Sequence, residues 1–280
     1  MKLGVLFWFY KDALLCRNRL RLLRRLNPGV PVYGLFGGPV AQEEHFRAEL
    51  GPLLDDFWAF RREEEPSWKY RHGDMVLQAW FDDRGRALAW DSLFLAQWDL
   101  VVVTSLSRLL PPMEEGDMLL SGLRPMRDVE GWWHWTRGAN GDEYERFMAG
   151  VRAAHGPASE PMCCQFISGV LPRRFFERYG DVAGDELGFL EYKIPVYAQV
   201  FGIRLVPDTC FRPWWAEDPS MAGASRRDKL VHAWPTSVRL PVMLAEAMRP
   251  GGRRAFHPYH GIYPHDLASV RELATHRRTG

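Results

Sequence analysis

The acidic residue with the clearest potential for chemistry is Asp99, which interrupts an otherwise uncharged segment. No other charged residue occurs between Leu93 and Val103. An ionised carboxylate inside a buried strand is costly unless another group compensates its charge. Backbone N–H groups or a nearby arginine are one solution, and a metal ion at the edge of a sheet is the other. The residues around Asp99 leave both solutions open.

Imidazoles that could complete a metal site occur near the end of the sequence. The segment FHPYHG contains His257 and His260. Mg²⁺ and Mn²⁺ take oxygen ligands, and Mn²⁺ also accepts histidine. The spacing of the two histidines does not match a zinc motif, and an isolated histidine is more often an ordinary core or surface residue. Our hypothesis from this pattern is that Asp99, His257 and His260 bind Mn²⁺ or Mg²⁺.

Two common nucleotide-binding motifs are missing from the sequence. No GxGxxG follows the first predicted strand, and GxxxxGK[ST] occurs nowhere. These motifs bind the phosphates of dinucleotides and of nucleoside triphosphates. Their absence argues against a dehydrogenase and against a P-loop NTPase.

Composition indicates an ordinary soluble globular protein. The chain has 280 residues, 46% hydrophobic and 25% charged, with a net charge of +1. This balance gives no reason to expect nucleic acid as a partner. The four cysteines form no CxxC pair, which favours a reducing compartment. No apolar run predicts a signal peptide or a transmembrane segment, so we expect a cytoplasmic protein.

Hydrophobic patterning predicts an α/β fold with a mostly parallel sheet. A strand over residues 2–10, a helix over 12–26 and a strand over 30–38 open the chain in strand–helix–strand order. Further strands are predicted at 55–60, 93–103, 116–125, 161–171 and 203–209, and further helices at 69–85, 138–147, 172–180 and 185–202. Residues 249–266 have neither period and are predicted to form a loop.

Ligands of such sheets gather beyond the carboxyl ends of the strands. The predicted ends carry aromatic, basic and acidic groups: Phe9, Tyr10 and Lys11; Gly37 and Gly38; Asp55 and Asp56; and Gln97, Trp98 and Asp99. We therefore expect the functional site at this edge.

Residues 90–110, WDSLFLAQWDLVVVTSLSRLL, resemble the metal-binding segment of glycosyltransferases with the GT-A fold. In this nucleotide-diphospho-sugar transferase family, of the family-2 kind, an Asp-x-Asp motif binds a divalent cation. Asp99 stands at the second carboxylate of the motif. Gln97 stands at the first, which is a departure and implies weaker dependence on metal.

Two other parts of the chain are similar to the same family. Residues 163–206 resemble the segment that carries the catalytic base of inverting members, and Glu191 falls at that base. The pair Asp185 and Glu186 is an earlier alternative. Residues 7–38 resemble the nucleotide-binding start of such enzymes. The late FHPYHGIYP is similar to a histidine-containing loop that closes over the diphosphate.

The resemblance implies a GT-A domain over residues 1–210 and a C-terminal extension over 211–280 packed on the same domain. It implies a transferase that moves a sugar from a nucleotide-diphosphate donor to a hydroxyl of an acceptor saccharide or small molecule, inverting and assisted by Mn²⁺ or Mg²⁺. Residues expected at the nucleotide are Phe9, Tyr10, Lys11, Asp56, Lys69, Arg71 and Trp98. Gly251 and Gly252 are expected to hinge a mobile loop over residues 253–264.

Two alternatives remain open. A degenerate GT-A scaffold that binds nucleotides without catalysis is compatible with Gln97. A nucleotidyltransferase uses a related sheet, but the glycine-rich basic signature that it needs after the first strand is missing. The aromatic loop with Trp132, Trp133 and Trp135 either stacks against the acceptor or packs over the sheet.

Overall fold

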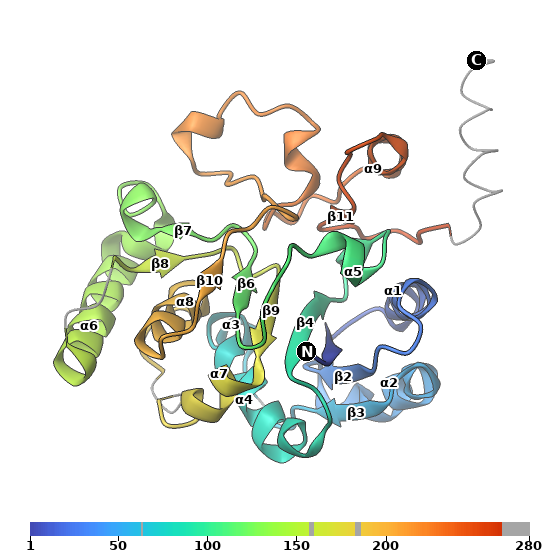
Figure 1. Ribbon diagram of the computed structural model, residues 1–280, viewed down its shortest axis with the longest axis horizontal. Coiled ribbons are helices and arrows are strands. Elements are labelled where there is room, and N and C mark those ends of the chain that lie inside the picture. The colour runs from blue at the N-terminus through green and yellow to red at the C-terminus, as the bar shows by residue number, and fades with distance from the viewer. Residues whose placement is uncertain (63, 157–159, 183–185, 265–280) are drawn as a thin grey trace.

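A seven-stranded sheet forms the centre of the protein (Figure 1). The computed structural model describes residues 1–62, 64–156, 160–182 and 186–264. The strand order is β10-β6-β9-β4-β1-β2-β3. The strands are β1 (Leu3–Phe9), β2 (Val32–Phe36), β3 (Asp56–Ala59), β4 (Ser92–Gln97), β6 (Met118–Leu120), β9 (Ser168–Pro172) and β10 (Leu205–Val206). The predicted α/β fold with a mostly parallel sheet is thus confirmed.

Strand direction decides which groups meet at one edge. Strand β1 pairs in parallel with β2 and β4, and β2 pairs in parallel with β3. Only β9 runs the other way, antiparallel to both β4 and β6, while β10 is parallel to β6. The carboxyl ends of six strands and the amino end of β9 therefore lie along the same edge of the sheet.

Helices cover both faces of the sheet because successive strand residues point to opposite sides. Val5 and Phe7 pack into the core that includes α1, whereas Leu6 packs into the core that includes α4 and α8. The helices are α1 (Ala13–Leu26), α2 (Glu43–Leu50), α3 (Pro66–Arg71), α4 (Gly73–Asp83), α5 (Leu106–Leu109), α6 (Gly138–His155), α7 (Arg173–Tyr179), α8 (Leu190–Val200) and α9 (Leu240–Met248). Short 3₁₀ turns lie at Val40–Gln42, Gly51–Leu53, Gly85–Ala87, Met126–Asp128, His134–Thr136, Pro219–Met221 and Asp228–Leu230.

Three predicted elements differ from the structure. The helix predicted over 69–85 is divided at His72 into α3 and α4. The strand predicted over 93–103 stops at Gln97 and resumes as β5 (Val101–Val102). Strand β5 pairs with β11 (Ala255–Phe256), which lies in the segment predicted to be a loop. A two-residue strand has no periodic signal, so its pairing partner alone creates it.

The C-terminal segment packs against the rest of the chain. Strand β11, helix α9 and the side chains of Tyr259 and Tyr263 share a small core with Leu22 of α1. A second two-stranded sheet joins β7 (Arg124–Pro125) to β8 (Met162–Cys163). Of the predicted extension, residues 265–280 lie outside the described part. Among the helices that the structure describes, none has the length and apolar character to cross a membrane.

Candidate active site

Asp99 occupies the turn between β4 and β5 and lies between two imidazoles. Its Oδ1 is 3.2 Å from His257 Nε2, and its Oδ2 is 3.6 Å from His260 Nε2. The backbone N–H of Tyr259 donates to the Asp99 carbonyl at 2.9 Å. This bond holds residues 257–263, which we call the histidine segment, beside the turn. The structure thus brings together the three residues that the sequence proposed as a metal site.

In the contact between Asp99 and His257, two hydrogen-bond acceptor atoms face each other when the His257 ring is neutral. Nδ1 of His257 lies 2.7 Å from the His232 carbonyl and must carry a proton to donate to it. In the neutral ring, Nε2 then presents a lone pair to the carboxylate. Asp99 Oδ1 and His257 Nε2 are both buried without a hydrogen-bond partner. A proton or a metal cation would satisfy both atoms.

The pKa of Asp99 follows from the same surroundings. Burial is the largest single influence and raises it, but the charge and hydrogen bond of His257, a backbone hydrogen bond and the charge of His260 together outweigh burial, so the net pKa lies below its usual range. In the described ranges, no group of three or more His, Cys, Asp or Glu side chains is already arranged around a metal position. One carboxylate and two imidazoles nevertheless form a donor set that suits Mn²⁺.

A stack of rings and cations borders Asp99. The Trp98 and His260 rings are parallel, with centroids 5.4 Å apart and an interplanar angle of 2°. Tyr10 meets Trp98 edge-on at 5.6 Å, and Lys11 Nζ lies 4.6 Å from the Trp98 ring centroid. Trp98 is buried, whereas Tyr10 and His260 are exposed. Tyr10, Lys11 and His260 are therefore accessible to a ligand, and Trp98 supports them.

Helix α1 holds the histidine segment in place through side-chain hydrogen bonds. Arg19, which is 1% exposed, donates to the carbonyls of Tyr259 at 2.7 Å and Gly261 at 2.8 Å. The Asn18 side chain donates to the Tyr263 carbonyl and accepts from its N–H. These bonds oppose the opening of a mobile loop over residues 253–264. Sequence reasoning missed both residues, whose only signal is their position among apolar residues of α1.

The predicted glycine hinge also has little freedom. Strand β11 begins at Ala255, and a Cβ atom on Gly252 would lie 2.1 Å from the Glu246 carbonyl oxygen. Gly252 is needed for close packing against the end of α9. The hinge interpretation of Gly251 and Gly252 therefore finds no support in the contacts.

Glu191 lies in the first turn of α8 and is 8% exposed. Burial raises its pKa to about 8, and the charge of Glu217 acts in the same direction. The backbone N–H of Phe166 donates to Oε1 at 2.7 Å and only partly offsets this effect. A carboxyl group with this pKa exchanges a proton close to neutral pH.

Glu191 could also have been a surface residue paired with Lys193 or Arg174, but the structure contradicts this interpretation. Lys193 is buried and pairs with Asp74 at 2.9 Å. Arg174 donates to the Gly116 carbonyl at 3.0 Å. Of the other candidate bases, Glu186 is described, and Asp185 lies outside the described residues.

Gln97 connects the two halves of the candidate site. Its side-chain amide donates to the Phe166 carbonyl at 2.7 Å. The N–H of the same residue, Phe166, donates to Glu191. Because Gln97 lies two residues before Asp99, this short chain of bonds sets Glu191 relative to the Asp99 turn. The amide at this position thus has a structural use that a carboxylate could not fill.

Lys69 and Arg71, both on α3, have different surroundings. Lys69 Nζ donates to the Gly37 carbonyl at 3.1 Å, just after β2, and burial lowers its pKa. Arg71 pairs with Glu143 and lies 5.2 Å from the Trp135 ring centroid. Lys69 is therefore at the edge where the site was expected, while Arg71 joins α3 to α6.

Two of the residues predicted at the nucleotide, Phe9 and Asp56, lie elsewhere in the structure. Phe9 is fully buried and packs against Phe36 and Phe46, because alternate residues of β1 point into this core. Asp56 is the first residue of β3 and pairs with Arg84. It therefore lies at the amino end of its strand, on the opposite edge of the sheet from Asp99.

The aromatic loop mostly contributes to the core. Trp133 is 3% exposed, and the Trp135 ring stacks on Phe189 with centroids 3.8 Å apart. Trp132 is half-buried beside Trp215. Packing, the second of the two alternatives, describes Trp133 and Trp135.

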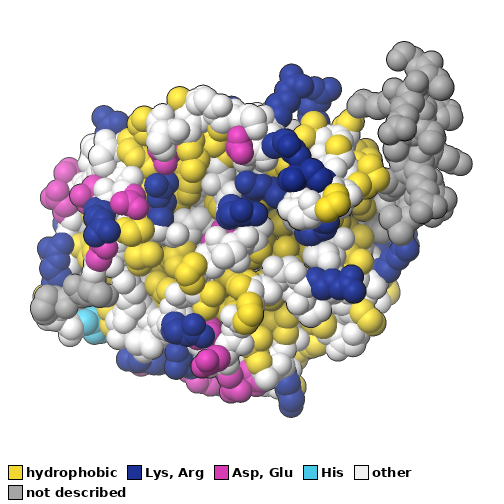
Figure 2. Space-filling model, turned by 45° about the horizontal axis from the view of Figure 1, so that its top comes forward, with side chains coloured by type: hydrophobic (Ala, Val, Ile, Leu, Met, Phe, Trp, Pro, Cys, Tyr) yellow, Lys and Arg dark blue, Asp and Glu magenta, His cyan; other side chains and the backbone are white. Residues whose placement is uncertain are grey.

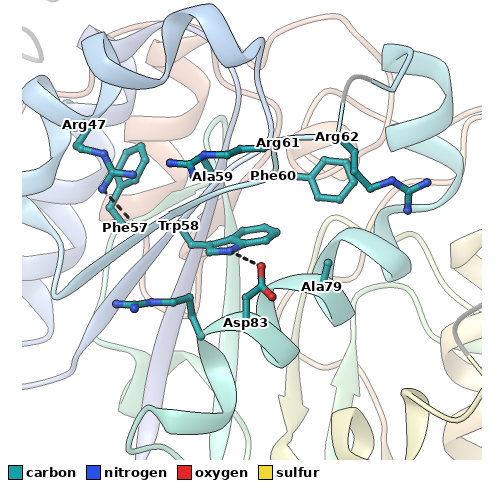
Figure 3. A pocket seen from close by; sticks show the side chains of 10 residues that line it. Arg47, Phe57, Trp58, Ala59, Phe60, Arg61, Arg62, Ala79 and Asp83 are labelled. Carbon is teal, nitrogen blue, oxygen red and sulfur yellow. Dashed lines mark hydrogen bonds between the residues drawn. The ribbon is translucent and has the colours of Figure 1, made fainter.

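A cavity of about 650 Å³ lies along β3, the edge strand of the sheet (Figure 3). Trp58 and Phe60 line it together with four arginines: Arg47, Arg61, Arg62 and Arg84. Each of these arginines pairs with a carboxylate of the chain: Glu43, Glu64 or Asp56. All four guanidinium groups are thus engaged in ion pairs, with Arg47 and Arg61 sharing Glu43, so we do not place the active site in this cavity.

Comparison with known proteins gives distant structural matches. No protein-family model and no curated protein matches the chain in sequence. Mouse xyloside xylosyltransferase 1, in its apo form, is a similar solved structure, with 11% identity and a TM-score of 0.40 over 92% of this chain and 97% of that one. The galactosyltransferase LgtC, in complex with donor and acceptor sugar analogues, has 12% identity and a TM-score of 0.43 over 97% and 96%. The bifunctional glycosyltransferase WbbM, in its apo form, has 11% and 0.41 over 73% and 39%.

These solved structures are of the class that the sequence resembles. At such identities and TM-scores the likeness carries no conclusion about activity. The residues of this chain carry the arguments that follow.

Proposed function

We propose that this protein is a glycosyltransferase that moves a sugar from a nucleotide-diphosphate donor to an acceptor hydroxyl with inversion. The observation that carries the proposal is the link between two chemically different centres at one edge of the sheet. One centre is the incompletely satisfied Asp99–His257 pair, and the other is buried Glu191, joined to it through Gln97 and Phe166.

The donor would bind at the ends of β1, β2 and β4. Tyr10 and His260 offer exposed rings, and Lys11 offers a positive charge beside them. Lys69 adds a second cation next to Gly37. A diphosphate needs such cations because it carries several negative charges.

Asp99, His257 and His260 would hold Mn²⁺ or Mg²⁺ in this site. Bound there, the cation would neutralise charge on the diphosphate leaving group. It would also satisfy the two facing acceptor atoms of Asp99 and His257. His232 would keep the His257 ring in the tautomer that leaves Nε2 free for this purpose.

Glu191 would act as the general base. The N–H of Phe166 holds Oε1, so Oε2 would take the proton of the acceptor hydroxyl. Burial raises the pKa of Glu191 to about 8, which makes its carboxylate a stronger base than an exposed glutamate. The same burial excludes water that would compete for the sugar.

A nucleotide-binding protein without catalysis is the second candidate, and Gln97 favours it. The amide of Gln97 is bonded to the Phe166 carbonyl and adds no negative charge beside Asp99. Such a protein would still bind nucleotide and metal. It would differ from an enzyme in the behaviour of Glu191.

Calorimetric titration with UDP, GDP and dTDP, with and without Mn²⁺, tests the binding half. Asp99→Asn should lose the Mn²⁺-dependent part of nucleotide binding and remain folded. Asp142→Asn, an exposed residue of α6, is the matched control and should bind as the wild type does. Binding by Asp99→Asn that equals the wild type would mean that Asp99 has only a structural role.

Turnover tests the chemical half. Glu191→Gln should lower kcat by roughly 10²- to 10⁴-fold while nucleotide affinity stays within about twofold. NMR of the product should show the anomeric configuration opposite to that of the donor. Full activity of Glu191→Gln, or a product with the donor's configuration, would contradict the assignment.

A further inference from the structure

A second cavity lies at the same edge of the sheet as the candidate site. Its volume is about 690 Å³. Gly122 and Arg124 line it just after β6, and Asp208 and residues 212–215 line it after β10. Since β6 and β10 run parallel to β4, these segments leave the sheet at the edge that carries Asp99.

The wall of this cavity is joined to the support of Glu191. Gln165 donates its side-chain amide to the Trp214 carbonyl at 3.5 Å, and the next residue, Phe166, donates to Glu191. Trp215 packs edge-on against Trp133, which contacts Phe189 at the start of α8. The wall of the cavity is therefore connected, through Gln165 and Phe166, to the residue that supports the proposed base.

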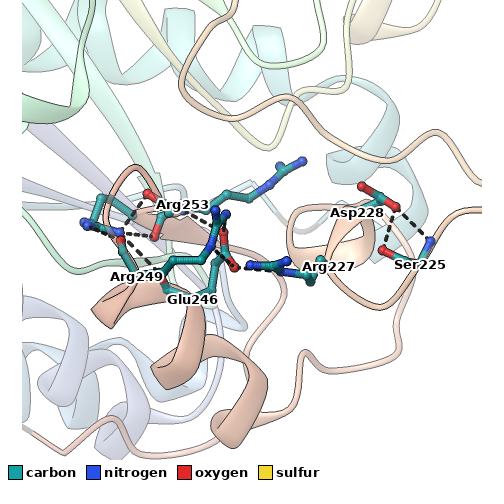
Figure 4. Close-up of polar contacts among 8 residues, drawn as sticks. Ser225, Arg227, Asp228, Glu246, Arg249 and Arg253 are labelled. Atoms are coloured by element: carbon teal, nitrogen blue, oxygen red, sulfur yellow. Dashed lines mark hydrogen bonds and ion pairs between the residues drawn. The ribbon is translucent and has the colours of Figure 1, made fainter.

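The acidic groups at the cavity are already engaged in holding its loops. Asp208 accepts hydrogen bonds from the backbone N–H groups of Gly122, Cys210, Phe211 and Arg212. Asp228 accepts from the N–H and the hydroxyl of Ser225 (Figure 4). These bonds give both carboxylates a role in holding the loops of the cavity wall.

Two of the arginines that line this cavity form no ion pair with a carboxylate in the described part of the chain. Arg212 is exposed, and in the described part of the chain its guanidinium has no hydrogen bond or ion pair. Its backbone has a positive φ of 41°, an uncommon conformation for a residue other than glycine. Arg253 donates from Nη1 to the carbonyls of Phe211 and Arg212 at 2.7 and 2.8 Å. Burial and the nearby Arg212 charge both lower the pKa of Arg253.

The position of Arg253 is fixed by the acidic side chain of Glu246. Its backbone N–H donates to Glu246 Oε1 at 3.2 Å, and Glu246 also binds Arg227 and Arg249 (Figure 4). Glu246 is buried, so this cluster fixes the end of α9 and the start of the segment that follows. Arg253 is thereby held at the cavity although a like charge is nearby.

The C-terminal segment as a whole also carries a positive net charge, which favours an anionic ligand. Residues 211–264 contain eight Lys or Arg and four Asp or Glu, whereas the entire chain has a net charge of +1. Figure 2 shows several Lys and Arg side chains close together on one face of the molecule. Trp214 adds a half-buried aromatic ring to the cavity wall.

We propose that this cavity binds the acceptor, and that the acceptor is a saccharide with an anionic group held by Arg212 and Arg253 while its ring lies against Trp214. This inference rests on the proposed function. Guanidinium groups bind both phosphate and carboxylate with paired N–H donors, so the shared chemistry is a singly or doubly charged oxyanion.

Calorimetric titration with three small probes tests the inference without any nucleotide. Glucose 6-phosphate carries phosphate, glucuronate carries carboxylate, and glucose carries neither. We expect at least one charged probe to bind about 10-fold or more tightly than glucose. The probe that binds identifies the oxyanion. Equal binding of all three, or no binding of a charged probe at millimolar concentration, would overturn the proposal.

Variants then locate the binding. Arg212→Gln should weaken binding of the charged probe about 10-fold or more, because it removes a charged donor that supports no other part of the fold. Arg226→Gln, an exposed arginine of the same segment outside the cavity lining, should change affinity less than twofold. Equal losses in both variants would reveal attraction to general surface charge and would reject the site.

A third variant separates this proposal from the proposed function. Asp99→Asn should leave binding of the charged probe unchanged while it removes metal-dependent nucleotide binding. If nucleotides fail to bind but the charged probe binds through Arg212, the proposed function fails and the anion site stands. If nucleotides bind and no charged probe does, the acceptor proposal alone fails.

Discussion

Replacement of Glu191 by glutamine should change how the stability of the protein depends on pH. Burial raises the pKa of Glu191 from its ordinary value of 4.5 to about 8. The folded protein therefore holds a proton that the unfolded chain releases near pH 4.5. This difference stabilises the folded state fully below about pH 4.5, and the stabilisation is lost as pH rises toward 8.

The size of the effect follows from the shift. Each pH unit between the two pKa values removes about 1.4 kcal/mol of stability, so the wild type should lose roughly 5 kcal/mol on this account. Relaxation around Glu191 would reduce the loss, and about 2 kcal/mol is still easily measured. Glutamine keeps an oxygen that can accept from Phe166 N–H but has no proton to release.

Urea unfolding at pH 5.5, 7.0 and 8.5 measures the difference. The free energy of unfolding of Glu191→Gln minus that of the wild type should become more positive as pH rises. Tyr70, Cys163 and Cys164 also interact with Glu191, but burial raises the pKa of each, so none titrates in this range. Glu177→Gln, an exposed residue of α7, is the control. Parallel pH profiles for wild type and Glu191→Gln would refute the reasoning.

Two further substitutions test the packing around the site. Gly122→Ala should destabilise the protein by about 1–3 kcal/mol in urea unfolding, because Gly122 has φ +67° and a Cβ would lie 2.7 Å from Pro213. Gly131→Ala has open space and should cost under about 0.5 kcal/mol, so equal effects would contradict the steric argument. Lys193→Met should cost about 3–5 kcal/mol, because it leaves the Asp74 carboxylate buried without its 2.9 Å partner. Thermal unfolding of this variant and of Lys193→Met with Asp74→Asn should show partial recovery in the double variant, and further loss there would count against the ion-pair explanation.

Local patterns in the sequence were sufficient for the sheet and for part of the site. Continuous apolar runs predicted β1, β2 and β4, and a lone charge in such a run drew attention to Asp99. The type of residue, rather than any period, drew attention to His257 and His260. The resemblance to a known family drew attention to Glu191, and its burial could not have been read from its neighbours in the sequence.

The errors have equally specific causes. Phe9 and Asp56 depend on where a strand begins and on which face a side chain takes, and a change of one residue reverses both conclusions. Strand β11 exists only because β5 pairs with it. Arg19 binds carbonyls 240 and 242 residues away, which no local pattern can reveal.

Those bonds from Arg19 make completion of the site a late event in folding. Contacts between segments so far apart in sequence form slowly, because a long stretch of chain must first be ordered. Until residues 255–263 dock, Asp99 lacks both imidazoles, and the Arg19 guanidinium inside α1 lacks two of its acceptors. A nascent or partly unfolded chain would therefore lack the assembled cluster of Asp99, His257 and His260, and the buried polar side chains of α1 would gain their partners in the same step that completes this cluster.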